Sequence, residues 1–111
     1  MNDDIAYLHH ILDAISRLEK YSARTTREEF GSDTLFQDAI IRQMEIIGEA
    51  AKRVSPELKK KHPQVPWSDI TGMRNKLIHG YMVVDIKAVW ATLERDIPML
   101  KEQVKAIIER E

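Results

Sequence analysis

Four polar side chains that could do chemistry lie within six positions of the stretch GMRNKLIHGY, residues 72–81: they are Arg74, Asn75, Lys76 and His79. A guanidinium beside an imidazole, with no metal, suits cleavage of an RNA phosphodiester by the substrate's own 2′-hydroxyl group. In such a reaction His79 would move protons, and Arg74 would neutralise charge on the phosphorane-like transition state. Asn75 could orient the phosphate or the imidazole, and Lys76 is a further candidate for binding the substrate.

The expected position of Arg74 is unusual for a helical residue. Apolar spacing predicts a helix from about residue 67 to residue 79, with Gly80 as its left-handed C-terminal cap. On a wheel of about 100° per residue, Arg74 falls inside the apolar arc and His79 lies about 140° away. An arginine on a buried side is costly unless it is paired or faces an anion. Its long side chain, and the end of the helix at His79, would let both groups reach one point.

A structural role for the same residues is the alternative. Arg74 could pair with Glu45 or Glu49 of the preceding long helix. His79 could do no more than interact favourably with the helix dipole. Gly72 costs about 1 kcal/mol relative to Ala inside a helix, which suggests that another backbone approaches closely at this point.

The rest of the chain predicts helices nearly throughout, with no strand-like alternation. Ser55 and Pro56 predict a short helix that ends at His62–Pro63, and Pro98 should kink the last helix or start a new one. The principal helices are expected at about residues 3–22, 33–54, 67–79 and 85–111. The chain is therefore expected to be a single all-α domain, residues 1–111, folded as an antiparallel bundle of four principal helices plus a short one.

Composition limits the classes of function that are possible for this chain. The formal net charge is −1, so contact with nucleic acid would need a local basic patch. The run KKKH at residues 59–62 is such a patch, or else a solvated helix face. The absence of cysteine excludes disulfides and thiolate zinc sites, and the histidines lack the spacing of ligands, so no metal or cofactor is expected. Without a signal peptide or an apolar span of roughly 18 residues, a cytoplasmic protein with no membrane segment is expected.

The stretch RNKLIHGY matches the pattern R-x-x-x-x-H-x-Y, with Asn75 as the polar residue after the arginine. It resembles the HEPN superfamily, and specifically the HepT-like toxins of the HepT/MntA type toxin–antitoxin systems. The likeness covers residues 39–81 nearly end to end and extends to the RDIP turn at residues 95–98, so most of the chain is involved.

The resemblance implies a HEPN-like helical bundle that forms a homodimer with its two motifs facing a shared cleft. It also implies a metal-independent endoribonuclease, with Arg74 and His79 as catalytic residues. The implied partner is a minimal nucleotidyltransferase antitoxin that transfers AMP from ATP to the motif tyrosine, here Tyr81. The alternative for Tyr81 is a half-buried packing residue with its hydroxyl in water.

Two other classes of function remain open. One is a non-catalytic HEPN module that helps a nucleotidyltransferase to bind nucleotide or to dimerise. The second is a plain helical dimerisation domain, which would explain the apolar seam of the last helix but not Arg74. The intact pair of Arg74 and His79 favours the enzyme, because a scaffold has no need of it.

Overall fold

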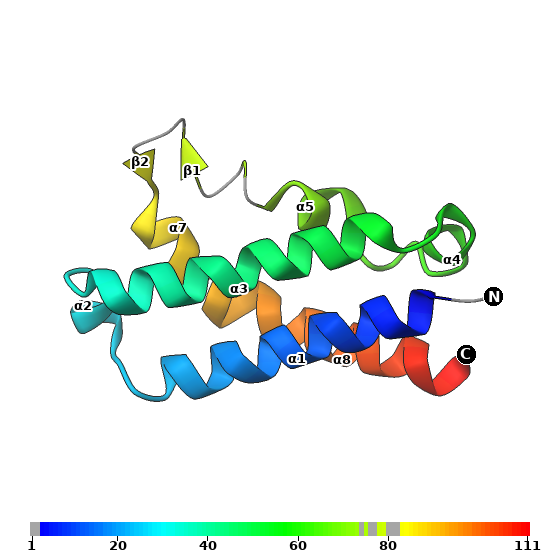
Figure 1. Ribbon diagram of the computed structural model, residues 1–111, viewed down its shortest axis with the longest axis horizontal. Coiled ribbons are helices and arrows are strands. Elements are labelled where there is room, and N and C mark those ends of the chain that lie inside the picture. Colours follow the sequence, from blue (N-terminus) through cyan, green and yellow to red (C-terminus); the bar gives the residue numbers. More distant parts are fainter. Residues whose placement is uncertain (1–2, 74, 76–77, 80–82) are drawn as a thin grey trace.

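The computed structural model describes residues 3–73, 75, 78–79 and 83–111 and has the expected all-α architecture. Three long helical segments lie side by side: α1 (Asp4–Ser22), α3 (Thr34–Arg53) and α8 (Ile97–Arg110). α1 packs against both α3 and α8, and the start of α1 lies beside the end of α3, so these two helices run antiparallel. Figure 1 shows α3 between α1 and the segment that runs from α5 to α7.

Polar caps fix the predicted helix starts. The Asp33 carboxylate accepts hydrogen bonds from the backbone N–H groups of Leu35 and Phe36, at 3.0 and 3.2 Å, which starts α3 at Thr34. The Ser55 hydroxyl accepts from the N–H of Leu58 at 3.2 Å, which starts α4 (Pro56–Lys61). The connection between α1 and α3 contains one helical turn, α2 (Arg27–Phe30), as its sequence allowed. The predicted limits of these elements are confirmed.

The C-terminal arm is built from α7 (Ile86–Ala91), a π-helical turn η1 (Thr92–Asp96) and α8. Pro98 falls in the first turn of α8, where its missing N–H group breaks no intrahelical hydrogen bond. The π-helical turn directly before it is a recognised way for a helix to absorb an irregularity. The sequence predicted that Pro98 kinks the last helix or starts a new one, and the structure places it in the first turn of α8, directly after the irregular turn η1 of a continuous helical arm. The apolar seam predicted for the last helix runs along this C-terminal arm. It is half-buried at Ile86 and buried at the other positions, which are Trp90, Leu93, Ile97, Leu100, Val104 and Ile107.

The prediction of one helix over residues 67–79 is wrong. α5 (Trp67–Thr71) ends at the C-cap Gly72, and Met73 and Asn75 are helical again. Two short strands follow, β1 (Ile78–His79) and β2 (Val83–Val84), which pair antiparallel with Ile78 opposite Val84 and His79 opposite Val83. Glycine is a poor helix former and β-branched residues favour strands, so local propensity prevailed over the helical spacing of the apolar residues.

This correction changes the count of principal helices. The principal helix expected at residues 67–79, the third of the four, is replaced by the five-residue α5 and separate short elements. The described chain also has a two-stranded pair where the sequence showed no strand pattern. Gly80, the predicted helix cap, lies outside the described residues. Of the described motif residues, Asn75 is helical and His79 lies in β1, so the motif does not continue α5 as one helix to His79.

Candidate functional site

The described residues of the motif segment follow α5 in the chain and include β1. Asn75 is in helical conformation and exposed, and the backbone of His79 forms part of β1. Arg74, Lys76 and Tyr81 lie outside the described residues. Since residues 78 and 79 belong to a strand, a helical wheel no longer relates Arg74 to His79, and their convergence on one point stays a prediction.

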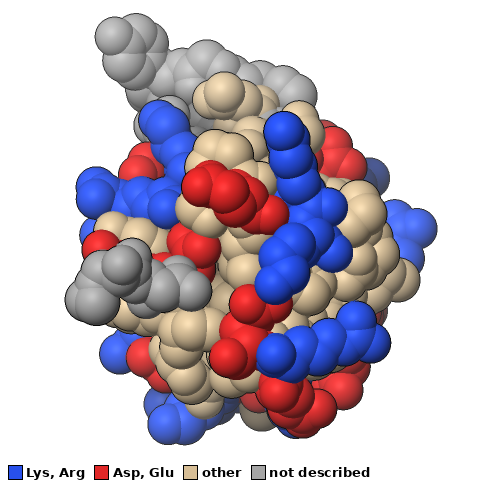
Figure 2. Space-filling model, turned by 90° about the vertical axis from the view of Figure 1, so that its right-hand side faces the viewer, with Lys and Arg blue, Asp and Glu red and all other residues tan. Residues whose placement is uncertain are grey.

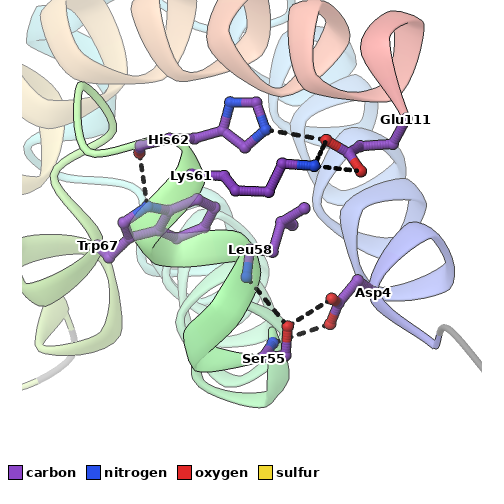
Figure 3. A network of polar contacts seen from close by, with 7 residues as sticks. All are labelled: Asp4, Ser55, Leu58, Lys61, His62, Trp67 and Glu111. Carbon is purple, nitrogen blue, oxygen red and sulfur yellow. Dashed lines mark hydrogen bonds and ion pairs between the residues drawn. The ribbon is translucent and has the colours of Figure 1, made fainter.

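α5 fixes the start of the motif segment to the core. Trp67, Ile70 and Met73 are buried, as expected for an apolar helix face. The indole Nε1–H of Trp67 donates to the backbone carbonyl of His62 at 2.9 Å. A buried indole N–H without a partner would be costly, so this hydrogen bond fixes how α5 follows α4. Figure 3 shows the Trp67 contact within a network that links α4 to both chain ends.

A close backbone approach is found at a glycine other than Gly72. Among the described residues, a Cβ atom on Gly72 would meet the carbonyl of Ser68 in its own helical turn, at 3.2 Å. On Gly48 of α3 it would meet the carbonyl oxygens of Ile70 and Thr71 in α5, at 3.2 and 3.7 Å. Gly48 therefore lets α5, and with it the start of the motif segment, lie directly on α3. Whether Gly72 serves a dimer contact is not tested within one chain.

The basic run at residues 59–62 has two different parts. Lys60 and Lys61 are exposed, but His62 is buried, with its Nε2 atom 3.2 Å from a carboxylate oxygen of Glu111. Figure 2 shows this end of the molecule, where Lys and Arg side chains alternate with Asp and Glu. Acidic side chains therefore interrupt the positive charge of this run, so it forms no continuous basic patch (Figure 2). Its histidine, His62, is buried.

The Glu111 carboxylate contacts two side chains at the end of α4, Lys61 and the C-cap His62. An ionised carboxylate can only accept, so His62 Nε2 carries the proton, and Lys61 Nζ lies 3.2 Å from the same carboxylate. The hydrogen bond from His62, with that from Lys61, lowers the pKa of Glu111. Sequence reasoning missed this contact. The four-residue spacing from buried Leu58 to His62 was a signal that the histidine faces inward.

A second missed contact joins α4 to the start of α1. Asp4 in the first turn of α1 is buried, and its carboxylate accepts from the Ser55 hydroxyl at 2.6 Å and from the Ser55 N–H at 2.8 Å. Ser55 in turn caps α4 (Figure 3). The two chain ends and α4 are therefore tied into one unit that supports α5.

The two carboxylates proposed as structural partners of Arg74 lie on α3. Glu45 Oε1 is 4.0 Å from Nη1 of Arg42, and Glu49 is exposed. Neither distance to Arg74 can be stated, because Arg74 is outside the described residues. In the part of the chain that is described, no three His, Asp or Glu side chains gather as metal ligands, and no helix is long and apolar enough to cross a membrane.

Residues 11–107, which include the whole motif segment, match the model of a protein family described as "Ribonuclease HepT-like". The chain belongs to the HepT-like ribonuclease family. A protein of Thermococcus cleftensis named "Probable ribonuclease HepT" is 43% identical over 95 residues, 86% of each chain. One from Caldanaerobacter subterraneus subsp. tengcongensis, named "Putative RNase", is 42% identical over 105 residues, 95% of this chain and 94% of the other.

A longer relative contains this HepT-like region as one part. The Methanocaldococcus jannaschii protein named "Gamma-glutamylcyclotransferase and putative RNase" is 41% identical over 103 residues, which are 93% of this chain but only 46% of the relative. No solved structure matches the chain at a significant level. Family membership thus rests on sequence over nearly the whole chain, and the resemblance seen in the motif is confirmed.

Proposed function

We propose that this protein is a metal-independent endoribonuclease that acts as the toxin of a toxin–antitoxin system in the cytoplasm. The observation that carries the proposal is the match to the HepT-like ribonuclease family over residues 11–107, with R-x-x-x-x-H-x-Y intact inside it. The relatives from Thermococcus and Caldanaerobacter are both named as ribonucleases, which supports the proposal. The alternative of a non-catalytic module retains no use for the arginine and histidine together.

The reaction assigns roles to residues of the motif. The 2′-oxygen of a ribose attacks the adjacent phosphorus, the bond from phosphorus to the 5′-oxygen breaks, and the 2′-hydroxyl proton leaves as the 5′-oxygen gains one. His79 moves protons in this exchange. Arg74 stabilises the extra negative charge on the phosphorane-like transition state. Asn75, which is exposed and therefore accessible to a substrate, and Lys76 bind the phosphate.

A homodimer would bring two motifs to one cleft. Two copies of Arg74 would supply more positive charge around one phosphate than a single chain with a formal net charge of −1 offers. The motif residue Asn75 is exposed, and the short β1–β2 pair lies at the periphery of the bundle (Figure 1), where a second copy has access.

We further propose that a nucleotidyltransferase antitoxin silences the enzyme by AMP transfer to Tyr81. The phenolic oxygen attacks the α-phosphorus of ATP, pyrophosphate leaves, and the phenolic proton is released. Tyr81 is two residues beyond His79 in the sequence, so the attached phosphate and adenosine would stand beside the catalytic residues. Both the added negative charge and the occupied space would oppose RNA binding.

The direct test compares RNA cleavage by the wild type, Arg74→Ala and His79→Ala in EDTA. Each substitution should lower the rate at least about 100-fold, the usual contribution of a proton-transferring or charge-stabilising group. His9→Ala is the matched control, because His9 is an exposed histidine on α1. Unchanged cleavage by either motif variant with a wild-type Tm would refute its catalytic role, and wild-type activity lost in EDTA would refute the metal-free mechanism.

The modification is tested by mass. The protein is incubated with ATP, Mg²⁺ and its nucleotidyltransferase, and the modified peptide is mapped. AMP increments should appear on the wild type and on Tyr21→Phe, and should be absent from Tyr81→Phe, with loss of ribonuclease activity in step. Full silencing of Tyr81→Phe by the antitoxin would show neutralisation by simple binding.

A further inference from the structure

Three surface grooves among the described residues differ in charge. The groove between α5 and the η1–α8 arm has Asp69 and Asp96 as its charged residues, and a second one beside α1 has Glu19 and Glu94. The third, about 310 Å³ between α1 and α3, has two arginines and a histidine against one carboxylate. Its lining includes Tyr7, His10, Arg42, Ile46, Glu49 and Arg53. In a protein of net charge −1, this α1–α3 groove is the one of the three that suits an anion.

The two arginines of the α1–α3 groove are available to a ligand. The side chain of Arg42 is 69% exposed and makes only a loose contact with Glu45, at 4.0 Å. Arg53 is exposed and has no ion-pair partner among the residues that the structure describes. Eleven residues of α3 separate them, about 16 Å along the helix axis. That spacing suits an extended polyanion that contacts each arginine with a different phosphate.

Aromatic rings on α1 lie in the same groove. The rings of Tyr7 and His10 meet edge to face, with centroids 6.0 Å apart and planes at 79°. Tyr7 is half-buried, so its ring is held in place, while His10 is exposed. Arginines beside fixed aromatic rings are the usual composition of surfaces that bind single-stranded nucleic acid, where phosphates meet cations and unpaired bases stack.

We infer that the α1–α3 groove binds single-stranded RNA as a second contact site, separate from the motif. The inference rests on the proposed function, because it assigns a binding path to the substrate of that reaction. Arg42 and Arg53 contact phosphates, and Tyr7 with His10 offers a face for a base. The half-buried side chain of Ile46 adds an apolar contact for the base.

The position of the groove around α3 connects it to the motif segment. Gly48 marks the direction in which α3 faces α5. Glu49 follows at about 100° around the helix and Arg42 at about 120°. An RNA strand in the groove therefore needs to cross only about a third of the circumference of α3 to reach the side that faces α5. Figure 1 agrees, since α3 separates α1 from that segment.

Substitution of Glu49 tests whether the α1–α3 groove binds a negatively charged ligand. Its carboxylate lies in the lining between the positions of the two arginines and repels phosphates. Loss of that charge should strengthen RNA binding, whereas loss of either arginine should weaken it. A groove that served only as a packing surface for protein would show no such opposite effects of neighbouring charges.

The experiment measures binding of a fluorescein-labelled 12-nucleotide single-stranded RNA by anisotropy, with His79→Ala as background so that the RNA survives. In Arg42→Ala/Arg53→Ala the affinity should fall about tenfold at low salt, and the slope of log K against log salt should decrease by about 1.4, for two lost phosphate contacts. Glu49→Gln should raise affinity about twofold. The control Lys105→Ala/Arg110→Ala, which removes two exposed cations from α8, should leave the slope unchanged.

Three outcomes overturn the inference. If the arginine variant binds RNA as its background does while the wild type cleaves RNA, the groove is no RNA site and the proposed function stands. If the His79→Ala chain binds no RNA and the wild type cleaves none, the proposed function fails and the inference with it. If the arginine variant turns a dimer into a monomer in sedimentation, the groove is instead an interface between copies of this chain.

Discussion

The end of the bundle around α4 and the segment that carries the motif are held in different ways. Around α4, polar contacts join side chains from both chain ends to this region: Asp4 bonds Ser55, Glu111 bonds His62, and Trp67 bonds the carbonyl of His62. In the motif segment, the structure describes backbone pairing between β1 and β2. The first region supports the fold, and the second contains the residues that are proposed for catalysis. Substitutions in the support should change the stability of the fold, and those in the motif should change activity alone.

The largest stability effect is expected at Trp67. Trp67→Ala removes a buried indole and its hydrogen bond to His62, which should cost about 3–5 kcal/mol in the free energy of unfolding measured with urea. Such a loss should also lower the cleavage rate, because α5 begins the motif segment. Unchanged stability would show that the α4 end is not the support proposed above.

Trp67→Phe and Trp90→Phe form a matched pair. Both tryptophans are buried, but the Nε1 atom of Trp90 has no hydrogen-bond partner among the described residues. Replacement of Trp67 should therefore cost about 1 kcal/mol more than replacement of Trp90. Equal costs would mean that the bond to His62 adds nothing.

An intermediate effect is expected at Gly48. Gly48→Val places methyl groups where the carbonyl of Ile70 would already be 3.2 Å from a Cβ, so α5 must move away from α3, at a cost of about 1–3 kcal/mol. Gly31→Val is the control, since a Cβ there has ordinary contacts of 3.4 Å or more and should change stability by less than about 0.5 kcal/mol. Equal thermal shifts in the two variants would contradict a close α3–α5 contact.

The smallest effect is expected from Glu111, and it depends on pH. His62 and then Lys61 hold the pKa of this carboxyl below its ordinary value of 4.5. The ionised carboxylate is therefore favoured in the folded state, and its contribution to stability is present above pH 4.5 and is lost as pH falls through the lowered pKa. Glu111→Gln should have a slightly lower Tm than the wild type at pH 7, and the difference should vanish in acid. A difference that is constant with pH would exclude this carboxylate as its cause.

Local signals in the sequence predicted the helix limits and the core. Asp33 and Ser55 as caps, and Pro98 at a helix start, act on residues within one turn, so their effects can be read without knowing the fold. The error at residues 72–79 came from extending an apolar periodicity through Gly72 as far as His79. Ile78 and His79 instead pair with Val83 and Val84 as two short strands, and β-branched residues favour strands.

Contacts between distant parts of the chain could not be predicted. The partner of His62 is 49 residues away, that of Asp4 is 51 residues away, and the backbone that approaches Gly48 belongs to another helix. A glycine in a sequence shows that an approach is possible, but only the packing shows where it takes place. For the site, the motif indicated which groups could react. Arg74, Lys76 and Tyr81 lie outside the described residues, so the arrangement of these groups stays a prediction.

The most direct measurement is expression of this chain alone in bacteria, wild type beside His79→Ala, with growth followed and total RNA examined for cleavage. Growth arrest and new RNA ends are expected with the wild type, and neither is expected with His79→Ala at equal protein level and equal Tm. Arrest of growth and RNA cleavage by both proteins alike would contradict the claim that His79 carries the reaction. Absence of arrest and of cleavage by the wild type would contradict the claim that the protein is a toxin ribonuclease.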